Sequence, residues 1–245
     1  MNPTKLSVNI NKWATLRNAR GGNRPHLIDT AKKMQTYGAQ GITVHPRPDE
    51  RHITYQDVRD LRPIVHTEFN IEGYPEQKFI DLVLENKPEQ VTLVPDPPGA
   101  LTSSFGWDTH AHFKQLQEVV KIFNDQGIRV SIFLDPNPGM LEPLKDIGAQ
   151  RIELYTETYA QAYHTAQREQ VTEQFAATAE QAIKMGLGVN AGHDLDLNNL
   201  HYFLQNVPQV LEVSIGHALI CDSIEMGMQN TVQMYKARCQ PNYSR

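Results

Sequence analysis

The sequence predicts an α/β protein with a single (β/α)8 (TIM) barrel domain over residues 1 to 245. Eight short β-like runs recur along the chain, helical stretches lie between them, and a polar residue stands at or near the end of most runs. Strands that alternate with helices are typical of parallel βαβ units, and the chain length suits one barrel. The runs are Lys5 to Ile10, Gly41 to His45, Thr67 to Glu72, Gln90 to Pro95, Arg129 to Asp135, Arg151 to Thr156, Leu187 to Gly192 and Val210 to His217.

Helical patterns fill the connections between these runs. In one of them, apolar residues from Leu116 to Phe123 recur at helical spacing and predict a buried stripe. Glycines just past four helices are typical of left-handed caps: Gly38, Gly127, Gly148 and Gly186. The predicted helices are His26 to Tyr37, Tyr55 to Ile64, Pro75 to Asn86, Phe113 to Asp125, Met140 to Ile147 and Asn198 to Leu204.

Two connections exceed what a minimal barrel needs. Glu157 to Gly186 is long enough for two helices, so we expect an added helix between strands six and seven. Its aromatic residues, Tyr159, Tyr163 and Phe175, fit either a subunit contact or packing on their own barrel. Asp96 to Ala111 holds prolines, glycines and a tryptophan, and predicts a loop over the barrel mouth that acts as a substrate lid.

The bulk composition narrows the class of partner. With a formal net charge of −5, the chain has no general attraction for nucleic acid or a membrane surface, whereas local basic clusters suit a small phosphorylated metabolite. Cys221 and Cys239 match neither a zinc motif nor a disulfide framework, which favours a reducing cytosol. We find no basic-then-apolar leader and no stretch long enough to span a bilayer, so we expect a cytoplasmic protein.

Alternation along the strands predicts which side chains enter the barrel. Apolar residues such as Leu6 and Val8 must face the helices, which leaves polar residues inside. Unpaired buried charge is costly, so the lower layers must pair internally, with Arg151 bound to Glu68 or Glu212. The inward set is Ser7, Asn9, Asn11, Thr43, His45, Glu68, Asn70, Glu72, Ser131, Phe133, Asp135, Arg151, Glu153, Tyr155, Glu212, Ser214 and Gly216.

The upper layer predicts chemistry rather than packing. His45, Glu72 and Glu153 converge with His193 at the C-terminal ends of the strands, where barrel enzymes place their active sites. Two Gly-His turns, within Ala191 to Asp194 and Ile215 to Ala218, lie where barrels commonly bind phosphate. Glycine allows close approach there, and the N-terminus of the helix that follows supplies amide donors.

Other familiar motifs are missing from the sequence. His110 and His112 alternate as two metal ligands do, but without a third ligand nearby a solvated loop is the better interpretation, and we predict no metal. Dinucleotide-binding, Walker A and Gly-x-Ser-x-Gly motifs do not occur. We therefore predict acid–base chemistry without a cofactor.

Several strings resemble one family nearly end to end, the pyridoxine 5'-phosphate synthases. They are Val8 to Ile10, residues 14–21 (ATLRNARG), 41–53 (GITVHPRPDERHI), 68–73 (EFNIEG), 91–95 (VTLVP), 151–156 (RIELYT) and the two Gly-His turns. The resemblance implies a (β/α)8 barrel that condenses 1-deoxy-D-xylulose 5-phosphate with 3-amino-2-oxopropyl phosphate in vitamin B6 biosynthesis. The pyridine ring closes, and phosphate and water leave.

Roles for individual residues follow from the resemblance by position. His45 and Glu72 resemble the proton-accepting pair, His193 the acid that assists phosphate departure, and Glu153 a residue that stabilises charge along the path. The resemblance also implies a homo-oligomer, such as an octamer built from dimers, with Arg20 acting across a subunit interface. Positions that match substrate contacts are Asn9, Arg20, Arg47, His52, Thr102, Gly216 and His217.

Two sites depart from well-known members of that family. Asn9-Ile10-Asn11-Lys12 stands where they read Asn-Ile-Asp-His, and Asp194 stands where they have glycine. The charge of Asp194 opposes a nearby phosphate unless it is turned away or neutralised, for which Lys12 is a candidate. The four acid–base residues are intact, so we expect the same reaction, with Asn11, Lys12 and Asp194 among the substrate-binding residues.

Two other functions fit parts of the pattern. A phosphosugar aldolase or isomerase of the same barrel class would, as an aldolase, depend on Lys12, the only lysine near a strand end. A non-catalytic barrel that binds a phosphometabolite is the other alternative. Four titratable groups at one rim argue against it, because a mere binding protein has no evident need for them.

Overall fold

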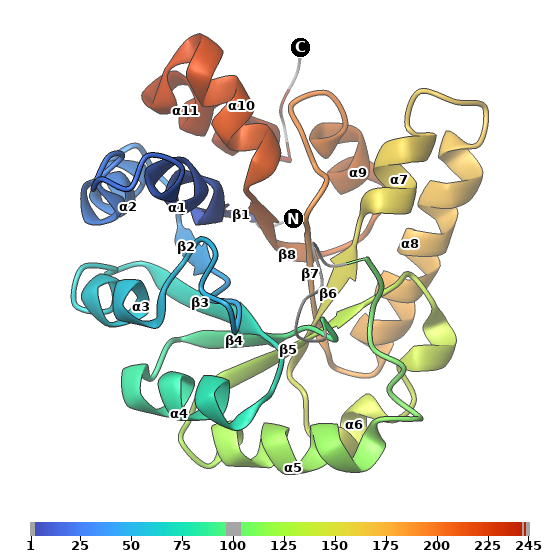
Figure 1. Ribbon diagram of the computed structural model, residues 1–245. Coiled ribbons are helices and arrows are strands. Elements are labelled where there is room, and N and C mark those ends of the chain that lie inside the picture. Colours follow the sequence, from blue (N-terminus) through green and yellow to red (C-terminus); the bar gives the residue numbers. More distant parts are fainter. Residues whose placement is uncertain (1–2, 97–103, 242, 244–245) are drawn as a thin grey trace.

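Eight parallel strands close into a barrel in chain order in the computed structural model, which describes residues 3–96, 104–241 and 243 (Figure 1). The ring closes between the first and last strands, with Ser7 opposite Ser214. The predicted (β/α)8 barrel is confirmed. The strands are β1 (Lys5–Asn9), β2 (Gly41–Val44), β3 (Glu68–Gly73), β4 (Gln90–Leu93), β5 (Arg129–Leu134), β6 (Arg151–Tyr155), β7 (Gly188–Gly192) and β8 (Val210–Ile215).

Helices surround the barrel and separate successive strands (Figure 1). The segment predicted to hold two helices between β6 and β7 forms α7 and α8. No helix in the described part of the chain is both long enough and apolar enough to cross a membrane. The helices are α1 (Asn11–Asn18), α2 (Leu27–Thr36), α3 (Tyr55–Leu61), α4 (Gln77–Asn86), α5 (Phe113–Asn124), the 3-10 turn η1 (Pro138–Met140), α6 (Leu144–Ile147), α7 (Glu157–Ala162), α8 (Arg168–Lys184), α9 (Leu200–Asn206), α10 (His217–Met226) and α11 (Met228–Arg238).

No residue range was predicted for three of these helices, α1, α10 and α11, although a helix was predicted to follow the last strand. The apolar stripe of α1 is thin, since Trp13 and Ala14 are its buried residues, and α10 begins only two residues after β8 ends. The helix predicted over Met140 to Ile147 is wrong in extent. Pro143 stands in the middle of it and lacks the N–H that a continuous helix needs, so a 3-10 turn and the short α6 form instead.

The core lies between the strands and the helix ring. The outward residues of β1, Leu6 and Val8, are fully buried, as is most of the predicted stripe of α5. Tyr159 packs edge-on against Phe203, with ring centroids 4.9 Å apart, and Phe175 joins this cluster, so these aromatic residues pack on their own barrel. The four glycines predicted to cap helices all have positive φ angles.

Inside the barrel, hydrogen bonds join polar side chains from strand to strand. Ser7 Oγ lies 2.8 Å from Thr43 Oγ1, Asn70 donates to Thr43, and Thr92 donates to Asn70 at 3.1 Å. At the lower end, Arg151 lies 3.8 Å from Glu68, which confirms the first of the two predicted pairings. Arg129, which the sequence did not single out, also binds Glu68.

The loop predicted as a substrate lid is described only in part. Residues 97–103, with Thr102 among them, lie outside the described residues. Its later part is anchored to the barrel, because the Gly106 amide donates to Asp135 Oδ2 at 3.0 Å and the Trp107 indole donates to the Leu93 carbonyl at 3.0 Å. Trp107 is buried there and therefore packs against the barrel wall.

Candidate active site

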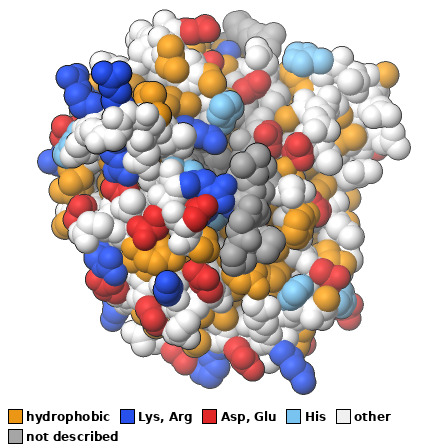
Figure 2. Space-filling model, viewed as in Figure 1, with side chains coloured by type: hydrophobic (Ala, Val, Ile, Leu, Met, Phe, Trp, Pro, Cys, Tyr) orange, Lys and Arg blue, Asp and Glu red, His pale blue; other side chains and the backbone are white. Residues whose placement is uncertain are grey.

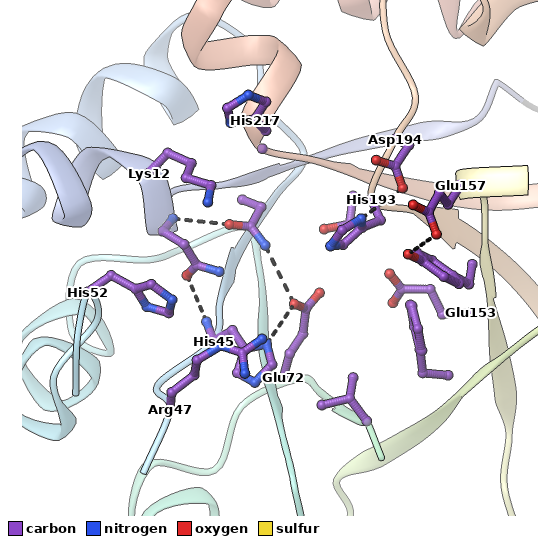
Figure 3. A pocket seen from close by; sticks show the side chains of 17 residues that line it. Lys12, His45, Arg47, His52, Glu72, Glu153, Glu157, His193, Asp194 and His217 are labelled. Carbon is purple, nitrogen blue, oxygen red and sulfur yellow. Dashed lines mark hydrogen bonds and ion pairs between the residues drawn. The ribbon is translucent and has the colours of Figure 1, made fainter. Parts of the chain in front are cut away.

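A cavity of about 330 Å³ opens at the C-terminal ends of the strands. All predicted site residues except Arg20 and Thr102 line it, so the barrel brings together residues that lie on β1, β3 and β6 or directly follow β2, β7 and β8. Figure 3 shows Lys12, Arg47 and His52 on one side and Glu153, Glu157 and Asp194 on the other. Basic side chains also gather near the centre of the face shown in Figure 2.

Arg20 does not reach this cavity in its own chain. It follows α1 and is exposed to solvent, outside the set of lining residues. Thr102 lies outside the described residues. These two positions therefore remain predictions.

His45 and Glu72 form a buried pair at the floor of the cavity. Glu72 Oε2 lies 3.8 Å from His45 Nδ1 and accepts a hydrogen bond from Asn9 Nδ2 at 3.5 Å (Figure 3). The Asn11 side chain fixes the start of the loop after β2, because its Oδ1 accepts the His45 backbone N–H at 2.8 Å. Asn11 therefore contacts the His45 backbone directly.

Burial sets the protonation of this pair. Burial, with Arg47 and His52 nearby, lowers the pKa of His45 well below its usual value. Burial and the neighbouring Glu153 raise the pKa of Glu72 well above its usual value. These shifts favour the neutral imidazole and the protonated carboxyl, the forms in which His45 can accept a proton and Glu72 can donate one.

Glu153 completes the carboxylate set from β6. Its Oε2 accepts a hydrogen bond from Thr92 Oγ1 at 3.3 Å, and burial raises the pKa of Glu153 to about 7. Gly192 on the next strand makes room for it, because a Cβ there would lie 2.7 Å from Glu153 Oε1 and 2.9 Å from the Ser214 carbonyl. The sequence predicts that Gly192 allows a phosphate to approach closely, but in the structure the space beside it holds the Glu153 carboxylate.

The opposite wall carries the cations. Arg47 Nη2 binds Asp96 Oδ2 at 2.8 Å, and the Lys12 side chain extends to the cavity from α1. His52 Nδ1 accepts the Ile53 amide at 3.0 Å, which leaves its proton on Nε2. Burial and Arg47 lower the pKa of His52 to about 4, so His52 is a neutral donor beside two cations.

The Gly-His turn after β8 has the geometry predicted for an anion site. Gly216 is the N-cap of α10, and no side chain caps that helix, so the first-turn amides have no intrahelical partner. Gly216 also lies against Asn9, because a Cβ on it would be 3.1 Å from the Asn9 Cβ. His217 is the first residue of the helix and lines the cavity.

The turn after β7 differs from the prediction, because no helix begins directly after it. The next helix, α9, begins only at Leu200, and the turn amides bind within the chain instead. The His193 N–H donates to the Ser214 carbonyl at 3.3 Å, and the Asp194 N–H donates to Thr156 Oγ1 at 3.1 Å. Asp194 Oδ2 binds His193 Nδ1 at 2.8 Å, so its partner is this imidazole rather than Lys12.

Sequence reasoning missed two lining residues, Val94 and Glu157. Val94 joins Phe133 and Tyr155 in an apolar wall, with the two rings 5.2 Å apart. Glu157 Oε2 accepts the Tyr155 hydroxyl at 2.7 Å. Its position two residues beyond β6 was the available signal, although Glu157 also begins the helical segment that follows.

In the ranges that the structure describes, no three His, Cys, Asp or Glu side chains lie close enough together to hold a metal ion. His110 and His112 are exposed, and each is bonded within the chain. His110 Nε2 lies 3.0 Å from the Gly139 carbonyl.

Comparison with solved structures agrees with the fold. The chain superposes on 3-keto-L-gulonate-6-phosphate decarboxylase from Vibrio cholerae with a TM-score of 0.67 at 10% identity, covering 100% of both chains. It superposes on N-(5'-phosphoribosyl)anthranilate isomerase from Pyrococcus furiosus with a TM-score of 0.59 at 11% identity, covering 96% of this chain and 98% of the other. At these identities the likeness concerns the barrel alone.

Sequence comparison is more specific. Relatives named pyridoxine 5'-phosphate synthase from Flavobacterium johnsoniae and Bacteroides thetaiotaomicron are each 58% identical, covering 95% of this chain and 98% of the relative. A relative of the same name from Cytophaga hutchinsonii is 56% identical, with coverage of 95% and 97%. The family model for pyridoxal phosphate biosynthesis protein PdxJ matches residues 6–241. This chain therefore belongs to the PdxJ family of pyridoxal phosphate biosynthesis proteins.

Proposed function

We propose that this chain is a pyridoxine 5'-phosphate synthase that joins 1-deoxy-D-xylulose 5-phosphate to 3-amino-2-oxopropyl phosphate. One observation carries the proposal: in a chain 58% identical to synthases over nearly their full length, His45, Glu72, Glu153 and His193 line one cavity. The alternative of a non-catalytic binding barrel has no evident use for four titratable groups that line one cavity.

The His45–Glu72 pair suits the condensation steps. When the amine attacks the ketone, a C–N bond forms, and the hydroxyl that results must leave as water. The raised pKa of Glu72 favours its protonated form, which can donate to that hydroxyl, and the lowered pKa of His45 favours the neutral imidazole, which can accept a proton from the nitrogen. The imine then forms without a free proton from solvent.

Glu153 and His193 suit the later steps. With a pKa of about 7, Glu153 is partly ionised near neutrality and can stabilise a cationic imine. His193, held by Asp194 at 2.8 Å, can act as the acid that protonates the departing phosphate. Loss of that phosphate breaks a C–O bond, and ring closure removes the remaining water.

The two phosphates require cationic or amide-lined sites. One is the start of α10, where Gly216 and His217 present uncapped amides. The other is the wall of Lys12, Arg47 and His52, whose guanidinium and ammonium groups complement an anion. Asn9 and Asn11 lie between these regions and supply neutral hydrogen-bonding groups.

Direct assay tests the proposal. The purified chain is incubated with both phosphates, and the pyridine product is followed by absorbance and mass while inorganic phosphate is measured in parallel. Product must depend on both substrates and must fall sharply in His45→Asn. Absence of the pyridine product with both substrates present would defeat the assignment.

Borohydride trapping separates the aldolase alternative. A Schiff-base enzyme would be labelled at Lys12 when it is reduced in the presence of substrate. The synthase we propose forms its imine between the two substrates, so borohydride should label neither the wild type nor Lys12→Gln. The substitution should weaken phosphate binding only. Covalent labelling of Lys12 would favour the aldolase.

A homo-oligomer is also part of the proposal. Arg20 lies outside its own cavity, and Leu16 on α1 and Ile224 on the neighbouring α10 are 53% and 76% exposed. Contact between subunits there would cover apolar surface and bring Arg20 near a partner site. Light scattering gives the subunit number. If Arg20→Gln lacks activity and mixing it with the His193→Gln chain, which retains Arg20, restores activity, the two subunits share residues of one active site.

A further inference from the structure

We infer that Asp194 is a positioning residue for His193: its carboxylate holds the imidazole by Nδ1, so that Nε2 is the nitrogen that exchanges protons with the substrate. The inference deepens the proposed function, since the role of His193 as an acid rests on it. It also gives Asp194 a task other than contact with a substrate phosphate.

The hydrogen bond determines the tautomer. His193 Nδ1 and Asp194 Oδ2 are 2.8 Å apart, and an ionised carboxylate only accepts hydrogen bonds. Nδ1 must therefore carry a proton, which leaves Nε2 as the nitrogen that gains and loses one. The carboxylate also stabilises the imidazolium form that an acid needs before it donates.

The backbone of the turn aims the side chain. His193 has φ of +93°, a conformation that side-chain-bearing residues rarely adopt and that clusters at functional sites. Three bonds hold it: the His193 amide donates to the Ser214 carbonyl, the Asp194 amide to Thr156 Oγ1, and Asn199 Nδ2 to the Asp194 carbonyl at 3.2 Å. Groups from β8, the end of β6 and the start of α9 thus fix one turn.

A ring contact restricts the imidazole from a second side. The Tyr155 ring meets His193 edge-on, with centroids 5.3 Å apart and an interplanar angle of 79°. Tyr155 is itself fixed, because its hydroxyl donates to Glu157 Oε2 at 2.7 Å. Carboxylate, strained backbone and aromatic ring together leave His193 few orientations, although the residue lies at the exposed rim of the cavity.

Electrostatics favour this assignment over phosphate contact. A carboxylate aimed at a phosphate would repel it, whereas one paired with an imidazolium forms a locally neutral unit. The turn after β7 also offers no free amides of its own for an anion at His193 or Asp194, since both donate within the chain. The anion site we propose lies instead at the start of α10, after the neighbouring strand β8.

The test compares Asp194→Ala, which removes charge and acceptor, with Asp194→Asn, which keeps an acceptor. With ¹⁵N-histidine labelling at alkaline pH, and His193→Gln used for assignment, wild type should show the Nδ1–H tautomer at His193. Asp194→Ala should shift it toward Nε2–H. We expect kcat to fall about 10- to 100-fold in Asp194→Ala, as is typical for loss of a group that orients a reactive histidine, and less in Asp194→Asn, with KM nearly unchanged.

A matched control removes charge elsewhere. Asp125→Asn, at the end of α5 beside Lys121, should leave kcat and the tautomer as in wild type. Unchanged tautomer and kcat in Asp194→Ala would overturn the inference, and so would a rise in KM alone, which indicates substrate contact. Because the tautomer is read without turnover, failure of the synthase assay would sink the proposed reaction without deciding the role of Asp194.

Discussion

The two ends of the barrel interior use the same residue type in opposite ways. At the lower end, Glu68 lies among Arg129, Arg151 and Lys5 and is neutralised by them. At the upper end, Glu72 and Glu153 make no ion pair with a Lys or Arg side chain anywhere in the described ranges. Both sets point inward from strands of one barrel, yet Glu72 and Glu153 have no Lys or Arg partner, and burial raises their pKa values.

The contrast explains where chemistry is possible. A carboxylate held by guanidinium groups stays ionised and serves structure. One that is buried without a cation has a pKa raised toward neutrality, as Glu153 has at about 7, and can exchange protons under physiological conditions. Glu212 is an intermediate case: it lies in the lower layer beside Arg151, but burial and Glu68 raise its pKa to about 8.

The largest effect is expected at the upper end. Glu72→Gln and His45→Asn should each lower turnover by roughly two to four orders of magnitude, because a proton donor or acceptor at the reacting centre is lost. The free energy of unfolding should stay level or rise, since a costly buried titratable group disappears. Steady-state rates and urea unfolding measure both, and a folded variant with full turnover would contradict the comparison.

Glu68→Gln should give the reverse pattern. Removing the anion leaves Arg129 and Arg151 close together without their partner, and we expect the free energy of unfolding to fall by about 2 to 3 kcal/mol, at the low end for a broken buried pair because Arg129 is partly exposed. The value of kcat should change by less than about threefold, as no catalytic group is altered. Urea unfolding of this variant beside Glu72→Gln is the matched measurement.

The pH profile should follow Glu153. Its pKa of about 7 means that the ionised form appears as pH rises through neutrality, so kcat should rise about fivefold over the pH unit below that value and about twofold more above it before it levels off. Glu153→Gln should remove this rise and lower the plateau. If the rise persists in the variant, another group carries it.

Stability should also depend on pH, through Glu212. Its folded pKa of about 8 lies above the ordinary value of 4.5, so its contribution to stability is complete below about pH 4.5 and is lost as pH rises through about 8. One such group lowers the free energy of unfolding by up to about 1.4 kcal/mol per pH unit in that window. Glu212→Gln should flatten the slope, and an equally steep slope would show that other groups cause it.

Much of the architecture was predictable because its signals are local. Alternation along each strand and helical spacing between strands depend on neighbours in sequence, and they located all eight strands to within one or two residues. The same alternation predicted that His45, Glu72 and Glu153 point into the barrel. Barrel enzymes have their active sites at the C-terminal ends of the strands, which predicted that the three residues lie at one rim. The weakly amphipathic α1 and α11 carried no such signal.

Partners across the barrel were beyond local reasoning. Nothing near Glu68 in sequence indicates Arg129, and nothing near Gly192 indicates that its missing side chain makes room for Glu153. The pKa values of Glu72 and Glu153 also depend on burial by many distant residues. Such properties arise only when strands far apart in the chain become neighbours.

The two Gly-His dipeptides separate what each level decides. The sequence by itself determined that both follow barrel strands and therefore lie at the functional rim. Only the tertiary structure decided that Gly216-His217 begins a helix with open amides, while Gly192-His193 forms a strained turn bonded to Ser214 and Thr156. The reason is physical: a dipeptide's backbone angles and hydrogen-bond partners are set by whatever packs against it, and those groups come from other strands.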